Sequence, residues 1–392
     1  MTLTAASGQS TAPGRRARWA SVGPLEHLDV LLAMLPVALS GWGLVMIYDA
    51  SRNRLAQAGL SRTYYVQRQG LAIGLGVIAM VAVMSIDYRR IREMWALVYL
   101  VALPVLAGVL VVGRNHRGAQ SWYQVGPLQL QPSEFAKVAL IVAIAGYCAQ
   151  HRGELDAWRL AVAAALAGGV MALVYAQHDL GTTLVIMVCA TAVLVVAGLK
   201  PIHVVVLLLL AGSLVGVAIT SGKVDAYRVD RLTGFLNQST KGIPVSQQTE
   251  AQYSLAASKA TIASGGLLGA GLFDGVQTSN GFVPEQHTDF IFTAVGEDLG
   301  FVGGATLMAL YGLLVWRLWR ISLLSADFFG TLVAIGVAAM FSIQVFENIG
   351  MTMGIMPITG IPLPFMSYGG SAVIASFVGV GLALNVHARR FS

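Results

Sequence analysis

Long apolar segments separated by short polar ones dominate this chain from residue 28 onward. A helix needs about 20 mainly apolar residues to cross a bilayer, and ten windows come close to that length. They are 28–48, 70–86, 95–113, 133–149, 159–176, 183–198, 202–220, 290–316, 328–348 and 370–386. The pattern predicts an all-α polytopic integral membrane protein with about ten transmembrane helices. Several windows are short or interrupted by glycine, so the number could differ by one.

The polar segments are short except for residues 221–288, between the seventh and eighth windows. Loops longer than about 15 residues are usually functional or disordered, and the aromatic and apolar clusters in this one favour a function. We therefore expect a basic tail at 1–27, one transmembrane domain at 28–386 that contains this large loop, and a short tail at 387–392.

The composition agrees with a membrane protein, because only 11% of the residues are charged and 56% are hydrophobic. Soluble domains carry about 25% charged residues. The net charge of +6 therefore reports orientation rather than affinity for nucleic acid. With an even number of spans, thirteen basic residues fall on the side of the termini, against six in the short loops opposite. Both termini are expected to be cytoplasmic and the 221–288 loop extracytoplasmic.

Acidic and imidazole groups gather where the eighth window begins, namely Glu285, His287, Asp289, Glu297 and Asp298. The pattern places Asp289 in the first turn of that span, with Thr288 as its N-cap. An acid that only starts a helix is one interpretation, and a functional carboxylate at the membrane surface is the other. Glu297 and Asp298 are expected to pair with other spans or to fix the helix.

The predicted outer segment before the fourth window also contains several polar and charged residues. Alternation around Leu128 predicts an extended piece, and Pro132 suits a helix start. Glu134 and Lys137 then share one face of a span. Ionisable residues inside a membrane usually mark function, although a structural ion pair remains open. Asp179 either caps the next helix or faces substrate.

Two irregular segments complete the picture. Glycines follow Ser264, at Gly265, Gly266, Gly269 and Gly271, and allow either close backbone packing or phosphate binding by exposed amides. Prolines at 357, 362 and 364 interrupt the last outer loop, which predicts a broken, re-entrant connection.

Together these motifs resemble those of the SEDS family (shape, elongation, division and sporulation), and within it the rod-shape members more than the division members. The matching stretches are RGAQ at 117–120 with Trp122, QPSE at 131–134 with Lys137, DLGT at 179–182, SGG at 264–266, PE at 284–285, HTDFIF at 287–292 and GIPLPFMSYGGS at 360–371. NIGM at 348–351 and GIMP at 354–357 favour the rod-shape members. The chain departs from the family at His178, where proline is common, and at Ala270, where lysine is often found.

The resemblance implies a peptidoglycan glycosyltransferase that polymerises lipid II into β-1,4 glycan strands during cell elongation, in the bacterial cytoplasmic membrane. Asp289 would be the general base, and undecaprenyl pyrophosphate the leaving group. Inversion at the anomeric carbon is expected from direct displacement. The expected partner is a class B penicillin-binding protein with transpeptidase activity. The residues carried over as substrate-binding are Glu134, Lys137, Arg114, Arg117, Trp122, Asp179, Ser264, Gly265, Glu285, His287, Ser367 and Tyr368.

Several alternatives remain at this point. Loop solvation explains Arg114, Arg117 and Arg228 equally well, and His287 is given no proton-transfer role. The sequence shows no ready cluster of metal ligands, so a divalent cation such as Mg or Mn would arrive with the pyrophosphate. A lipid II flippase would also have broken helices and intramembrane charges, but the two halves show no convincing inverted repeat. A non-catalytic scaffold would explain the long loop and not the charged residues.

Overall fold

The computed structural model describes residues 28–116, 119–125, 128–153, 156–200, 202, 235–238, 244 and 247–390. Helices dominate this part of the chain. They are α2 (Val30–Gln57), α3 (Tyr64–Ser85), α4 (Tyr88–Glu93), α5 (Trp95–Val112), α6 (Pro132–Gln150), α7 (Ala157–Ala176), α8 (Leu180–Ala197), α11 (Glu250–Ser264), α12 (Val276–Asn280), α13 (Ile291–Asp298), α14 (Gly300–Leu324), α15 (Phe328–Met353) and α16 (Gly370–Ala388).

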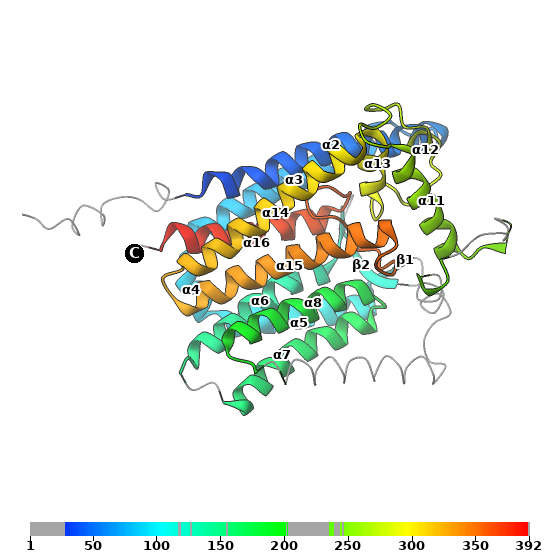
Figure 1. Cartoon of the computed structure of the whole chain (residues 1–392). Helices are drawn as coiled ribbons and strands as arrows, with labels where there is room; N and C mark the ends of the chain where they lie inside the picture. Colours follow the sequence, from blue (N-terminus) through cyan, green and yellow to red (C-terminus); the bar gives the residue numbers. More distant parts are fainter. Residues whose placement is uncertain are drawn as a thin grey trace, which may run out of the picture.

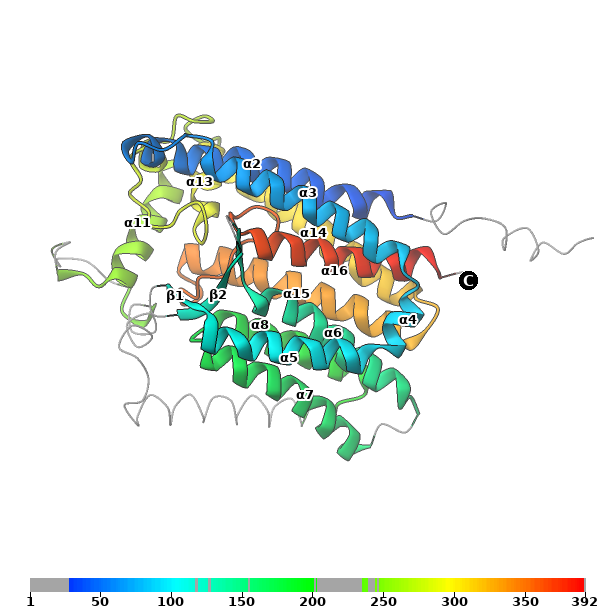
Figure 2. The same cartoon turned by 180° about the vertical axis from the view of Figure 1, so that it is seen from behind.

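The long helices run side by side in one bundle, with the C-terminus at one end and α11, α12, α13 and the strands at the other (Figures 1 and 2). α16 packs along α3, and α15 packs against α6, α8 and α14. The central helices are the most enclosed: 83% of the apolar window of α16 is buried, against 11% for α5. Exposed apolar side chains on α5, such as Leu100 and Val111, suit contact with lipid.

Nine of the helices in the described part are long and apolar enough to cross a membrane. They correspond to nine of the ten predicted windows, so the predicted multi-pass membrane fold is confirmed. The seventh window, 202–220, lies outside the described residues apart from Ile202.

The prediction of one continuous eighth span from residue 290 is wrong. The chain forms α13, breaks at Leu299 and starts α14 at Gly300, whose φ is +63°. Glycine adopts this left-handed backbone without steric cost. A Cβ at Gly300 would also lie 2.3 Å from the backbone nitrogen of Gly269. This backbone contact ends α13. The pattern of apolar residues carries no information about it, so the break was not predicted.

The glycine-rich segment after α11 makes that contact. The amides of Ala270 and Gly271 donate to the carbonyls of Glu297 and Asp298, at 2.9 and 3.0 Å. In return, the Phe301 amide donates to the Gly266 carbonyl at 2.9 Å. Of the two interpretations of these glycines, the structure supports close backbone packing.

A small antiparallel sheet precedes α6. Its strands are β1 (Arg114–His116), β2 (Ala119–Val125) and β3 (Leu128–Leu130), in the order β1-β2-β3. The extended piece predicted around Leu128 is therefore confirmed. Its far end leads directly into α6, where Pro132 occupies the first turn as predicted.

Candidate active site

The first turns of α6 carry a buried ion pair. Lys137 Nζ donates to Glu134 Oε1 at 2.8 Å, and both side chains are almost fully buried. The proline at the helix start fixes where the first turn lies, so positions three apart share one face. The two side chains share one helix face as predicted, and they form the ion pair that the sequence left open. The pair lies inside the protein.

Asp179 caps the neighbouring helix α8. Its Oδ1 accepts from the Thr182 amide at 2.9 Å, as the capping interpretation predicted. Its Oδ2 accepts from the Gln131 side chain at 3.1 Å, which ties α8 to the residue before α6. His178, just before the cap, has a φ of +66°. Proline has a φ fixed near −65°. The backbone conformation of His178 is therefore one that the proline common in the family cannot adopt.

The end of α15 adds two polar residues that the motif analysis did not include as site residues, Glu347 and Asn348. Glu347 is fully buried, and its carboxylate lies within electrostatic range of Lys137 and Asp179. A carboxylate next to an amide in an otherwise apolar window was the sequence signal for both.

Asn348 connects this cluster to Asp289. Its side-chain Nδ2 donates to the backbone carbonyls of Asp289 and Ile361, both at 2.8 Å. The start of α16 joins the same region, because Ser371 Oγ accepts from the Gln131 amide at 2.9 Å. Elements far apart in the sequence therefore meet at the end of the bundle opposite the C-terminus (Figure 2).

Asp289 lies in a turn before α13, and not in the first turn of a span. The N-cap position belongs to Phe290, and the Thr288 hydroxyl donates instead to the Glu285 carbonyl at 3.0 Å. The prediction of Thr288 as an N-cap is therefore wrong. The Asp289 amide also donates to that carbonyl at 3.1 Å, and Glu285 has a φ of +49°. This compact turn, with Asn348, holds a half-buried carboxylate in place.

His287 is packed between aromatic rings. Its ring centroid lies 4.4 Å from that of Tyr65 and 5.7 Å from that of Tyr368, and its carbonyl accepts from the Tyr368 amide at 2.9 Å. Burial lowers the pKa of His287 to about 4, against the opposing effect of the nearby Glu285 carboxylate. The imidazole is therefore neutral at pH 7 and a weak base.

Three of the candidate substrate contacts have structural partners. Ser264 ends α11, and its hydroxyl donates to the Thr261 carbonyl at 2.7 Å. Gly265 packs so tightly that a Cβ would lie 1.9 Å from the Gly296 carbonyl oxygen. These residues lie at a helix C-terminus, where carbonyls rather than amides are left over, so of the two open interpretations the structure favours close packing over an amide cradle for phosphate. Ser367 Oγ accepts from the Leu363 amide at 2.9 Å.

The remaining candidates lie on or near the sheet. Trp122 is half-buried on β2, opposite the backbone of Arg114 on β1. Arg117 and Arg228 lie outside the described residues. Within the described ranges, no group of three or more His, Cys, Asp or Glu residues is arranged to hold a metal ion.

The bundle consists of apolar helices that enclose charged side chains at one end. This arrangement is that of a polytopic membrane protein with a polar site between its helices. The family model for FtsW, RodA and SpoVE, described as cell cycle protein, matches residues 29–391. The chain belongs to this family, which is the predicted SEDS family.

Several relatives match over nearly the whole chain. Stage V sporulation protein E of Bacillus subtilis is 35% identical over 363 residues, which cover 91% of this chain and 96% of the relative. The probable peptidoglycan glycosyltransferase FtsW of Geobacter metallireducens is 34% identical, with 93% and 96% covered. The peptidoglycan glycosyltransferase MrdB of Escherichia coli K12 is 33% identical, with 96% and 97% covered.

Solved structures show the same fold. A chain of a peptidoglycan synthase complex, described by its coordination of polymerization and crosslinking, matches with a TM-score of 0.77 and 32% identity, covering 93% of this chain and 98% of that one. The rod shape determining protein RodA of Thermus thermophilus matches with a TM-score of 0.67 and 31% identity, with 93% and 98% covered. The relatives carry sporulation, division and rod-shape names, so a role in elongation stays a prediction.

Proposed function

We propose that this chain polymerises lipid II into β-1,4 glycan strands, with Asp289 as general base and undecaprenyl pyrophosphate as the leaving group. The class of activity follows from the family: the chain is a peptidoglycan glycosyltransferase, as its relatives MrdB and FtsW are named. The observation that carries the proposed site is the Asn348 side chain, which joins the Asp289 turn to the end of α15, beside the charged residues at the starts of α6 and α8.

Chain growth requires a sugar 4-hydroxyl to attack the anomeric carbon of a lipid-linked donor. The C–O bond to the pyrophosphate breaks as the new glycosidic bond forms, and a base accepts the hydroxyl proton. A half-buried carboxylate on a turn held by hydrogen bonds suits that role, because little reorganisation is needed when the charge develops. Direct displacement by one base inverts the anomeric centre.

Lys137 is the proposed cation for the developing negative charge, with Glu134 as its positioning partner. Lys137 is paired and buried in this structure. Contact with the pyrophosphate would therefore require the substrate to share the ammonium with Glu134. A divalent cation that arrives with the pyrophosphate would supply further charge stabilisation.

The proposed setting follows from the same family. A class B penicillin-binding protein would crosslink the new glycan, in line with the synthase complex whose chain shares this fold. The chain would lie in the bacterial cytoplasmic membrane with both termini cytoplasmic, so that Asp289 works at the outer face.

A polymerisation assay tests the proposal. Purified protein with its penicillin-binding partner receives labelled lipid II in detergent, and the products are separated on a gel. Asp289→Asn keeps the size of the side chain and should reduce glycan ladders by about 100-fold or more. Asp274→Asn is the matched control, because it removes an exposed carboxylate from the same part of the chain. It should leave the ladders intact.

Other outcomes reassign the function. Ladders that persist in Asp289→Asn and vanish in Glu285→Gln would move the base to Glu285. A protein that makes no ladder but moves lipid II across vesicles would be a flippase. A protein that does neither and only raises the partner's own activity would be a scaffold.

A further inference from the structure

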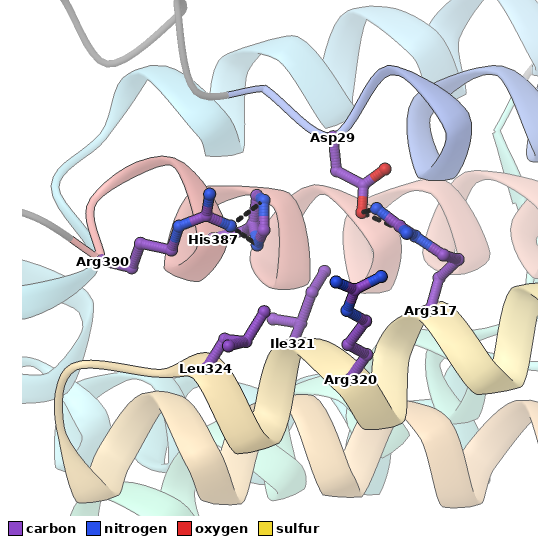
Figure 3. A pocket seen from close by; sticks show the side chains of 7 residues that line it. All are labelled: Asp29, Arg317, Arg320, Ile321, Leu324, His387 and Arg390. Atoms are coloured by element: carbon purple, nitrogen blue, oxygen red, sulfur yellow. Dashed lines mark hydrogen bonds and ion pairs between the residues drawn. The ribbon is translucent and has the colours of Figure 1, made fainter.

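Arg68, one turn into α3, differs from two other half-buried arginines of the described part. Arg52 lies 3.3 Å from the Asp49 carboxylate. Arg317 Nε donates to Asp29 Oδ2 at 2.9 Å, in the cavity at the opposite end of the bundle (Figure 3). Arg68 is also half-buried, yet within the described ranges no carboxylate pairs with it. No acidic side chain in those ranges therefore offsets its charge by direct contact.

Aromatic side chains hold Arg68 in place instead. Its guanidinium carbon lies 4.4 Å from the centroid of the Tyr64 ring, and the Tyr368 hydroxyl is within hydrogen-bond range. A guanidinium group over a ring uses its flat face for that contact, which leaves the N–H donors on its edge for hydrogen bonds. Paired donors on one edge match the oxygen atoms of a phosphate group. Arg68 is therefore suited to an anionic ligand.

The same aromatic group connects Arg68 to the Asp289 turn. The ring centroid of Tyr65 lies 4.8 Å from that of Tyr368 and 4.4 Å from that of His287. The Tyr368 amide also donates to the His287 carbonyl at 2.9 Å. His287 precedes Asp289 by two residues, so their Cα atoms are at most about 7 Å apart. The start of α3 therefore lies against the turn that carries the proposed base.

The depth of Arg68 along α3 suits the phosphates of a lipid. Gln69 fixes this part of α3 to the start of α16, because its side chain donates to the Ser367 carbonyl and accepts from the Gly369 amide, both at 3.1 Å. α3 has 22 residues and is about 33 Å long, against about 30 Å for the hydrocarbon core of a bilayer. Arg68 lies about 6 Å from the start of the helix, and a long side chain at that depth reaches the headgroup level.

We propose that Arg68 binds the pyrophosphate of the lipid-linked donor and of the released lipid product. This inference rests on the proposed polymerase function, in which Lys137 is buried and paired with Glu134. Arg68 supplies a second cation, one that is only half-buried. As the C–O bond to the anomeric carbon breaks, its electron pair passes to the pyrophosphate, and Asp289 accepts the proton of the attacking hydroxyl. The Arg68 guanidinium group stabilises the charge that the pyrophosphate gains.

Binding of the lipid product tests this role without turnover. Purified full-length protein in neutral detergent is titrated with undecaprenyl pyrophosphate or with dioctanoyl phosphatidylglycerol, and the midpoint of thermal unfolding is measured. A ligand that binds only the folded state raises that midpoint. Arg68→Gln should weaken binding of undecaprenyl pyrophosphate about fivefold or more, because an amide lacks the charge and the paired donors. It should leave phosphatidylglycerol binding unchanged, and the midpoint without lipid reports any loss of stability separately.

Arg62→Gln is the matched control. Arg62 is an exposed arginine just before α3, so this variant removes the same charge from the same end of the bundle. It should bind both lipids as the wild type does. An equal loss of undecaprenyl pyrophosphate affinity in this variant would reduce the effect to general surface charge.

Two further results would overturn the inference. Equal affinity of Arg68→Gln and the wild type for undecaprenyl pyrophosphate would remove Arg68 from the site. An equal loss for phosphatidylglycerol would make Arg68 a contact for the headgroups of bulk lipid. If Arg68→Gln does not fold, Arg68→Lys keeps the charge without the paired donors, and its affinity should still fall about twofold or more. Wild-type affinity in Arg68→Lys would also contradict guanidinium recognition.

This experiment and the test of Asp289 fail separately. Product binding needs no base, so ladders that persist in Asp289→Asn would refute the base and leave the Arg68 result as it stands. Unchanged binding in Arg68→Gln would refute the pyrophosphate contact and leave the test of Asp289 unaffected.

Discussion

Lys137 donates a hydrogen bond to Glu134 one helical turn earlier, and neither side chain reaches solvent. The pair also lies beside Glu347, a second buried carboxylate within range of the same ammonium. The Lys137 ammonium group is therefore the neighbouring cation of both Glu134 and Glu347, in a region of low dielectric constant. Removal of that cation leaves both acidic groups without a partner, whereas removal of the Glu134–Lys137 pair leaves only Glu347 without one.

Lys137→Met should therefore destabilise the fold by about 3–5 kcal/mol, the usual cost of a buried charge that loses its partner. The double variant Glu134→Gln with Lys137→Met should recover at least half of that loss. Both should lack polymerase activity if the ammonium serves the reaction. Unfolding in detergent followed by circular dichroism gives the first quantity, and the gel assay the second. Equal instability of the single and double variants would contradict the ion-pair argument.

Local patterns predicted much of this architecture. Apolar windows located nine spans, Pro132 located the start of α6, and the spacing of Glu134 and Lys137 predicted their contact. A helix cap was one of the two interpretations of Asp179, because a side chain at that position reaches its own helix. Each of these features depends on residues close together in the sequence.

Features that depend on distant backbone contacts were not predictable. The break at Gly300 follows from pairing with the Gly266 region, more than 30 positions earlier, while the apolar pattern continues across it. The same pairing explains why the Gly265 region packs closely against α13. Glu347 lies near Lys137 only because α15 packs on α6 and α8, far along the chain from Lys137.

His178 adopts a left-handed backbone with a φ of +66°, and its amide donates to the Tyr175 carbonyl at 3.0 Å. His178→Pro should cost about 2 kcal/mol or more, because proline can neither take that φ nor donate. His178→Gly should be neutral or stabilising by up to about 1 kcal/mol, since glycine relieves the strain. Thermal unfolding of the two variants checks this opposite ordering. A proline variant as stable as the wild type would show that this turn can change its backbone freely.

His287 predicts a pH dependence of stability. Its pKa falls to about 4 in the folded protein because of burial, while an unfolded chain titrates near the ordinary value of 6.5. Between these values the unfolded state binds more protons, so the free energy of unfolding falls as pH drops from 6.5 towards 4. The loss should reach about 3 kcal/mol at the lower end. His287→Phe should flatten this part of the curve and keep the ring contacts.

Tyr368→Phe is the control for that measurement, because it removes one hydroxyl and keeps the imidazole and its packing. It should retain the full slope between pH 4 and 6.5. A His287→Phe curve that runs parallel to the wild type over this range would assign the acid sensitivity to other groups.

Glu297 and Asp298 are adjacent acids with opposite expected effects. Glu297 accepts from the amides of Gln277 and Thr278, both at 2.8 Å, and from the Thr278 hydroxyl at 2.7 Å. Asp298 is buried against the Asp49 carboxyl, and burial, then that neighbour, raise the pKa of Asp298 to about 8. The Glu297 carboxylate therefore accepts hydrogen bonds from the free amides at the start of α12. The Asp298 carboxyl group instead favours its protonated form.

Glu297→Gln should therefore destabilise the protein by about 2 kcal/mol, because an amide cannot accept these bonds with the same charge assistance. Asp298→Asn should instead remove a pH slope. The folded state binds the extra proton between pH 4 and 8, so wild-type stability falls as pH rises through that range. Urea unfolding in detergent at pH 5 and pH 8 separates the two cases. The difference between Asp298→Asn and wild type should grow in favour of the variant towards pH 8, and a difference that is constant with pH would assign the proton to another group.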